Sequence, residues 1–223
     1  MNQSLFVQAI GKVLLGIALV GALIFLPAGT WHYPNGWLFL AVLFVPMLVA
    51  GVVLMVKHPD LLKKRLNAKE SEATQRRVIG ASALVFVLSF VLSGLCFRFQ
   101  RFLVPDWVVW VACGVFLLGY ALYGVVIAHN RWLARTVEIQ PGQQLVDRGP
   151  YAVVRHPMYT AVVLMFLSIP LILGSWLAFF PFLSFPYILV CRIRNEEQVL
   201  TAGLAGYADY KTRVKYRLIP FVW

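Results

Sequence analysis

Charged side chains are scarce in this chain, and their absence is concentrated in four long stretches. Of the 223 residues, 61% are hydrophobic and 13% are charged, whereas a water-soluble domain carries about 25% charged residues. Lys, Arg, Asp and Glu are missing altogether from residues 13–56, 78–97, 107–130 and 158–191. A transmembrane helix needs about 20 such residues to cross roughly 30 Å of hydrocarbon. These stretches therefore predict membrane spans and exclude an ordinary soluble protein.

Two further patterns are absent. The sequence contains no Gly-x-Gly, which excludes a Rossmann-type site for a nucleotide cofactor. The three cysteines, Cys96, Cys113 and Cys191, lie in or beside apolar segments without paired spacing. This favours buried free thiols over a disulfide or zinc framework, so we expect no metal site.

The apolar stretches predict an all-α protein with four helices in its first half. The first stretch is interrupted by the turn-rich residues 27–36, so we expect helices near 5–26 and 36–56. Two more are expected near 78–97 and 107–128. The basic segment 57–77 separates the two pairs, and the leucines within 57–66 predict a short helix lying on the membrane surface.

The 34 uncharged residues from 158 to 191 are too long for one span. As a single helix they would extend about 51 Å at 1.5 Å per residue. Pro170, Gly174 and Ser175 lie at the middle, where a turn is favoured. We therefore expect a helical hairpin near 158–172 and 176–191, with kinks in its second helix, and about six transmembrane helices in all.

Lysine and arginine predict the orientation of these spans. Segments 57–77, 129–157 and 191–223 contain seven, four and six of them, whereas 27–35 and 98–106 contain none and two. Successive connecting segments lie on alternate sides of the membrane, so six spans place the three basic segments on the same side. The positive-inside rule predicts that this side is cytoplasmic. The net charge of +11 is thus a signal of topology, with contact to anionic lipid as a secondary use, and it does not indicate a nucleic-acid partner.

Two adjacent carboxylates, Glu196 and Glu197, follow the last apolar stretch. Ionisable groups at membrane depth are costly and are usually functional or paired. One interpretation is a functional site. The other is that the pair only neutralises nearby arginines such as Arg155 and Arg192, since ion-pair networks produce the same clusters.

His156 and Pro157 stand at the expected start of the hairpin. A lone histidine at a helix start is usually a cap, and proline fits the first helical turn. Here an arginine, a histidine and two tyrosines gather at one helix N-terminus. Together with the helix dipole and free backbone N–H groups, they would form a good binding site for an anionic group.

Several motifs occur in order along residues 129–223 and together resemble a known family. They are Gly149-Pro150-Tyr151, Arg155-His156-Pro157-Met158-Tyr159, a helical hairpin, Arg192 with Glu196-Glu197, and Tyr207-x-x-Tyr210. This pattern resembles the isoprenylcysteine carboxyl methyltransferase family, and it is similar to the related phospholipid N-methyltransferases.

The resemblance implies a multi-pass membrane methyltransferase that uses S-adenosylmethionine in a pocket facing the cytoplasm. It implies a methyltransferase core at 129–223, preceded by a four-helix membrane region at 1–128 that includes the basic segment 57–77. The positions that match cofactor-binding residues are Gln144, Leu145, Val146, Tyr151, His156, Pro157, Tyr159 and Glu196. The matching candidates for a catalytic role are Arg192 and Glu197.

The chemistry of the methyl acceptor stays open between two classes. A lipophilic carboxylate, for instance on a prenylated molecule entering from the bilayer, is already ionised at neutral pH and needs alignment rather than a base. Arg192 would hold it. An amine, as in a phospholipid, would have to lose a proton, and Glu197 would accept that proton. Two rival functions are a nicotinamide-dependent membrane reductase and a non-catalytic membrane protein.

Overall fold

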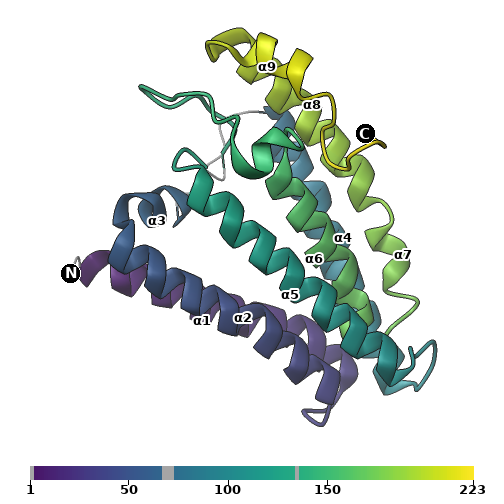
Figure 1. The fold of residues 1–223 in the computed structure, drawn as a ribbon. Coiled ribbons are helices and arrows are strands. Elements are labelled where there is room, and N and C mark those ends of the chain that lie inside the picture. Colours follow the sequence, from purple (N-terminus) through teal and green to yellow (C-terminus); the bar gives the residue numbers. More distant parts are fainter. Residues whose placement is uncertain (1–2, 67–72, 134–135) are drawn as a thin grey trace.

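The computed structural model describes residues 3–66, 73–133 and 136–223, and the named elements in these ranges are all helices (Figure 1). Part of the basic segment, residues 67–72, lies outside the described residues. The all-α fold expected from the sequence is confirmed.

Four helices are long and apolar enough to cross a membrane, so the chain is a multi-pass integral membrane protein. They are α1 (Gln3–Ala28), α2 (Pro34–Lys57), α4 (Ala73–Arg98) and α5 (Asp106–His129). The apolar part of each has 24 residues, about 36 Å of helix at 1.5 Å per residue. This length exceeds the roughly 30 Å of hydrocarbon and confirms the four expected N-terminal spans.

The expected short helix in the basic segment is present as α3 (Pro59–Leu66). Leu61 and Leu62 are buried in a small cluster with Leu5 of α1 and Leu54 of α2. The Nζ group of Lys12 donates a hydrogen bond to the carbonyl oxygen of Leu66 at the end of α3. These contacts fix α3 against the ends of the first two helices.

The second half differs in one respect from the expected hairpin. Helix α6 (Pro157–Ile172) ends where expected, and the chain reverses at Gly174, whose φ of +78° is a conformation that glycine adopts without strain. The return is not one helix near 176–191. It consists of α7 (Phe179–Phe182) and α8 (Phe185–Gly203).

Two prolines explain this break. Pro181 and Pro186 lack the backbone N–H that a continuous helix requires, and Pro186 instead occupies the first turn of α8. Helix α6 has 16 residues, about 24 Å, and α8 is longer but contains charged residues such as Arg192 and Glu197. Within the described ranges, only the four long helices are both long and apolar enough to span a membrane.

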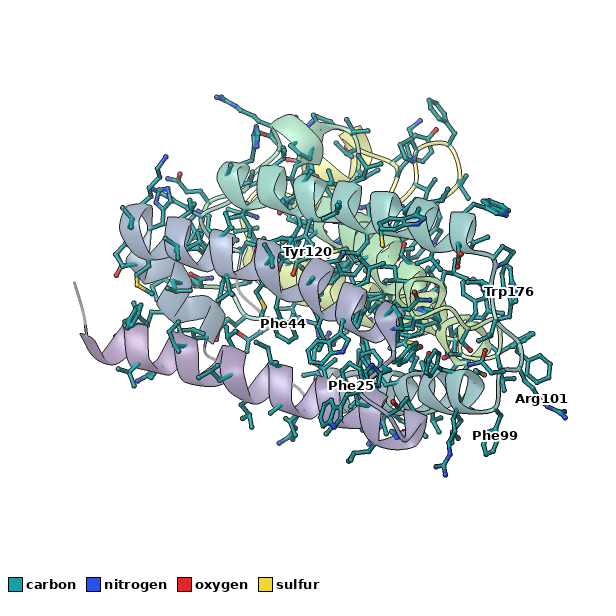
Figure 2. The ribbon with its side chains drawn as sticks, turned by 90° about the horizontal axis from the view of Figure 1, so that it is seen from below. Phe25, Phe44, Phe99, Arg101, Tyr120 and Trp176 are labelled. Atoms are coloured by element: carbon teal, nitrogen blue, oxygen red, sulfur yellow. The ribbon has the colours of Figure 1, made fainter. Side chains whose placement is uncertain are left out.

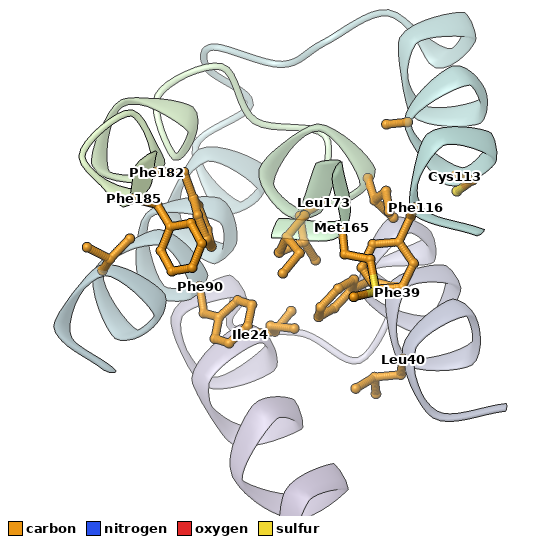
Figure 3. Packing of buried hydrophobic residues seen from close by; sticks show 14 of the residues in the cluster. Ile24, Phe39, Leu40, Phe90, Cys113, Phe116, Met165, Leu173, Phe182 and Phe185 are labelled. Carbon is orange, nitrogen blue, oxygen red and sulfur yellow. The ribbon is translucent and has the colours of Figure 1, made fainter. Parts of the chain in front are cut away.

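Aromatic side chains from several helices fill the core (Figure 3). Phe39 of α2, Phe90 of α4 and Phe116 of α5 lie within it, together with Phe182 and Phe185 of the returning chain. Such rings bury large areas and prefer tilted or edge-on contacts like those seen here.

Helices α5 and α6 approach each other closely because Gly119 has no side chain. A Cβ at this position would lie 2.7 Å from Cγ of Met165 and 3.0 Å from the carbonyl oxygen of Ala161. Small residues at helix contacts allow this kind of backbone approach in membranes. The contact sets the position of the start of α6, where the polar residues gather.

The loops at one end of the bundle are tied together. Val104 N donates to the carbonyl of Gly174 over 3.1 Å, and Trp176 N donates to the carbonyl of Phe102 over 2.9 Å. Figure 2 shows Phe99, Arg101 and Trp176 pointing outward at this end. Exposed aromatic residues of this kind form belts at membrane interfaces. The opposite end holds α3, α9 (Tyr207–Arg213) and the polar segments (Figure 1).

Candidate functional site

A polar hollow lies at the end that carries α3 and α9. Its walls come from residues 130–133 and 136–146, the turn Gly149–Ala152, the start of α6, and α8 and α9. Its volume is about 100 Å³, which is smaller than the roughly 300–1,000 Å³ of common binding sites for small molecules.

The polar hollow brings together most of the site residues expected from the sequence. Those that line it are Gln144, Leu145, Val146, Tyr151, His156, Tyr159, Arg192 and Glu196. Two expected residues are not part of its lining. Pro157 is buried as the first residue of α6, and Glu197 borders a shallower surface depression with Lys211 and Arg217.

Glu197 is enclosed by basic side chains. Its Oε1 atom accepts from Arg155 Nε over 2.7 Å and lies 3.3 Å from His156 Nε2, and its Oε2 atom accepts from Arg217 Nε over 3.0 Å. Burial by itself raises the pKa of Glu197, but the hydrogen bonds from His156, Arg155 and Arg217 outweigh burial and lower this pKa to about 2. Glu197 is thus a stable anion that ties three segments together.

The chain after α9 lies along the start of α6 and is fixed there by Arg155. The guanidinium of Arg155 donates to the carbonyls of Val214 and Lys215 over 2.7 and 2.9 Å. The backbone N–H groups of Arg155 and His156 donate to the carbonyls of Tyr216 and Arg217, each over 2.9 Å.

These bonds change one expectation from the sequence. The binding site for an anion at the start of α6 was expected to offer free backbone N–H groups. Those of Arg155 and His156 are taken by residues 216–217, and Pro157 has none. What His156 presents to the hollow is its ring, which is stacked on Tyr159 with centroids 5.7 Å apart.

A chain of three polar groups crosses the floor of the polar hollow. Arg192 Nε donates to the hydroxyl of Tyr159 over 2.8 Å, and that hydroxyl donates to Glu196 Oε2 over 2.5 Å. Arg192 and Glu196 lie one turn apart on α8, as their spacing predicts. The link between them is therefore indirect, through Tyr159.

Sequence reasoning did not assign Tyr207 to the site, although its Tyr207-x-x-Tyr210 motif was visible. Tyr207 is 3% exposed and lines the hollow, and its hydroxyl has no hydrogen-bond partner among the described residues. Burial raises its pKa, as do the charges of Glu197 and Glu196. The hydroxyl therefore remains a proton donor, and a buried donor of this kind normally has a partner. A polar ligand in the hollow would supply one.

An apolar groove adjoins the polar hollow. It has a volume of about 450 Å³ and runs between α4, α6 and α8, where Phe86, Phe166 and Phe185 contribute to its walls. The groove and the polar hollow share the residues Thr136, Met158, Tyr159 and Arg192. The polar hollow and the apolar groove thus meet at Tyr159 and Arg192.

Comparison with known families identifies the region that contains most of this site. Residues 110–202 match the model of the isoprenylcysteine carboxyl methyltransferase (ICMT) family. This match covers α6, the turn after it and almost all of α8. The resemblance expected from the sequence motifs is confirmed.

Three similar proteins come from different organisms. The uncharacterized protein YpbQ of Bacillus subtilis is 26% identical over 165 residues, which cover 74% of this chain and 95% of YpbQ. The Delta(14)-sterol reductase TM7SF2 of Mus musculus is 37% identical over 91 residues, 40% of this chain and 22% of the reductase. The cobalt-zinc-cadmium resistance protein CzcN of Cupriavidus metallidurans is 29% identical over 129 residues, 57% of each chain.

Proposed function

We propose that this chain, whose residues 110–202 carry an ICMT family domain, is a methyltransferase that uses S-adenosylmethionine. We propose further that its acceptor is a lipophilic carboxylate. The observation that supports this most directly is the polar hollow and the apolar groove meeting at Tyr159 and Arg192. A methyl transfer to a membrane lipid needs such a junction, because the donor is polar and the acceptor has a long apolar tail.

The polar hollow suits the functional groups of the cofactor. S-adenosylmethionine supplies a methyl group on a positively charged sulfur, next to an ammonium, a carboxylate, a ribose and an adenine. Glu196 and Glu138 would accept from the ammonium or the ribose, and the unpaired hydroxyl of Tyr207 would donate to an acceptor atom. The ring of His156 would bind the carboxylate, and Trp132 offers an aromatic surface for the adenine.

The reaction asks little of the protein except alignment. S-adenosylmethionine bound in the hollow would supply the methyl group with its sulfur as the leaving atom, and an ionised carboxylate would accept that group without losing a proton. Arg192 would hold the carboxylate at the junction, and its bond to the hydroxyl of Tyr159 would keep the guanidinium in place. Alignment of this kind is worth several orders of magnitude in rate.

The low pKa of Glu197 favours a carboxylate over an amine as the methyl acceptor. An amine acceptor needs a general base, whose pKa should lie near the working pH. The hydrogen bonds from His156, Arg155 and Arg217 hold the pKa of Glu197 at about 2, so it is a poor base, and we assign it instead to anchoring residues 214–217.

A nicotinamide-dependent reductase is the second candidate, since the 37% identity to a sterol reductase falls on part of this chain. A dinucleotide carries several phosphate charges and would need cations without other partners. In the polar hollow, Arg155 bonds Glu197 and Arg192 bonds Tyr159, and the carboxylates of Glu138 and Glu196 also face the ligand. This charge pattern favours the cationic S-adenosylmethionine.

Calorimetric titration of the purified protein distinguishes these functions. We expect S-adenosylhomocysteine to bind and NADPH not to bind. His156→Ala and Glu196→Ala should each weaken S-adenosylhomocysteine roughly 10- to 150-fold, since each removes a hydrogen bond to a charged group, worth about 1.5–3 kcal/mol. Unchanged affinity in both variants would contradict the assignment of the hollow, and tight NADPH binding would favour the reductase.

We also propose six spans, an active site facing the cytoplasm in the cytoplasmic membrane, and a functional division near residue 128. A membrane-impermeant maleimide tests the orientation in a background without the three native cysteines. Asp60→Cys and Thr212→Cys should react only when the cytoplasmic side is accessible, and His32→Cys only from outside. Reaction of position 32 from the cytoplasm would reverse the topology.

A further inference from the structure

We infer that Arg65 of α3 is a second cation for the head of the acceptor, which makes the apolar groove selective for amphiphiles with an anionic carboxylate. The inference rests on the proposed function and deepens it. Arg65 and Arg192 both line the groove, and Arg192 also lines the polar hollow. None of the described residues that line the groove is an aspartate or a glutamate.

Arg65 reaches the groove from outside the long helices and is held there. Its Nη2 atom donates to the hydroxyl of Tyr123 on α5, and its guanidinium carbon lies 5.0 Å from the centre of that ring. Its Nη1 atom lies 3.4 Å from the carbonyl oxygen of Leu133. With α3 itself fixed by Leu61 and Leu62, the guanidinium has a defined position, so little conformational entropy is lost when it binds a ligand.

The charge on this guanidinium acts where solvent is partly excluded. Arg65 is half-buried, and the walls beside it include Val78, Ile79 and Phe86 of α4. In such surroundings a cation attracts an anion more strongly than in water and disfavours a second cation. An amphiphile whose apolar tail lies in the groove would therefore turn its carboxylate toward Arg65 and Arg192, the two arginines of the groove lining.

The lipid pair N-oleoylglycine and its methyl ester tests the head group with the tail held constant. Native mass spectrometry of the detergent-solubilised protein measures the bound fraction of each without requiring turnover. The wild-type protein should prefer the acid, and Arg65→Gln should reduce this preference roughly five- to thirtyfold, as expected for one bond between a charged pair near the surface. Arg65→Lys should retain part of it, because the charge remains but the forked geometry is lost.

Lys63→Gln is the matched control, because it removes the same charge from an exposed position on the same helix. If Lys63→Gln lowers the preference as much as Arg65→Gln does, surface potential is responsible and the inference is wrong. A wild-type preference for the ester or for oleylamine would also overturn it, as would full preference in a folded Arg65→Gln. An S-adenosylhomocysteine titration of the same samples reports on the methyl donor alone, so its failure would count against the proposed function and not against Arg65.

Discussion

Glu197→Gln is expected to lower the free energy of unfolding by about 3–5 kcal/mol, because it leaves Arg155, Arg217 and His156 around a neutral amide. The side chain of Glu197 is only 5% exposed, so water cannot replace the lost charge. Residues 214–217 should also detach from the start of α6. Trypsin should then cleave at Lys215 in the variant much faster than in the wild-type protein. Fluorescence-monitored unfolding in detergent measures the first effect, and mass spectrometry of the digest measures the second.

The stability that Glu197 contributes should depend on pH with a defined sign. Folding lowers the pKa of Glu197 from 4.5 to about 2, a change worth roughly 3 kcal/mol. The contribution is present in full above pH 4.5 and is lost as the pH falls toward 2. The wild-type protein should therefore lose stability across this window, and Glu197→Gln should lose less. Asp209→Asn is the control, since Asp209 is exposed. Equal stability of Glu197→Gln and wild type would contradict the anchoring role.

Arg192→Ala is expected to reduce methyl transfer roughly 10- to 150-fold while the affinity for S-adenosylhomocysteine stays within about threefold of wild type. The reason is the order of the hydrogen bonds that link Arg192, Tyr159 and Glu196. Arg192 donates to the hydroxyl of Tyr159, and that hydroxyl donates in turn to Glu196. Removing Arg192 thus leaves the bond between Tyr159 and Glu196 in place but takes away the cation at the junction. A tritiated-methyl assay with a prenylated cysteine analogue and with membrane lipid extract measures turnover, beside a binding titration.

Arg194→Ala is the matched control, because Arg194 is exposed on the same helix and borders neither the polar hollow nor the apolar groove. It should retain near-normal turnover. Full turnover in Arg192→Ala would rule out the acceptor role. Loss of cofactor affinity in Arg192→Ala would instead assign Arg192 to the support of Glu196. With an amine acceptor, Glu197 would be the more sensitive position.

The long helices could be read from the sequence because the length of an apolar stretch is a local property. Gly174 likewise marked the reversal after α6 correctly, whereas Pro170 lies inside α6. The split between α7 and α8 was not predictable in this way. A proline either kinks a helix or ends it, and here the outcome depends on how Phe182 and Phe185 pack in the core with residues far away in the chain.

The same distinction applies to the site. Glu196 lies four residues after Arg192, so helical spacing alone predicted that these two side chains would share one face of the helix. The partners of Glu197 were only partly foreseen. Arg217 reaches it because the chain after α9 turns back along α6, and nothing in the local sequence specifies that path. Arg65 was missed for the same reason, since its place depends on how α3 docks.

A methyl donor in the polar hollow and an acceptor in the apolar groove would share a wall and would therefore be thermodynamically interdependent. Thr136, Met158, Tyr159 and Arg192 belong to both sites, so a ligand that moves the ring of Tyr159 in one site reshapes the other. If a bound donor changes the affinity for the acceptor by some factor, thermodynamic linkage requires a reciprocal effect. The bound acceptor must then change the affinity for the donor by the same factor. S-adenosylhomocysteine and the methylated product would share the same wall, so each would change the affinity with which the other is held before it dissociates.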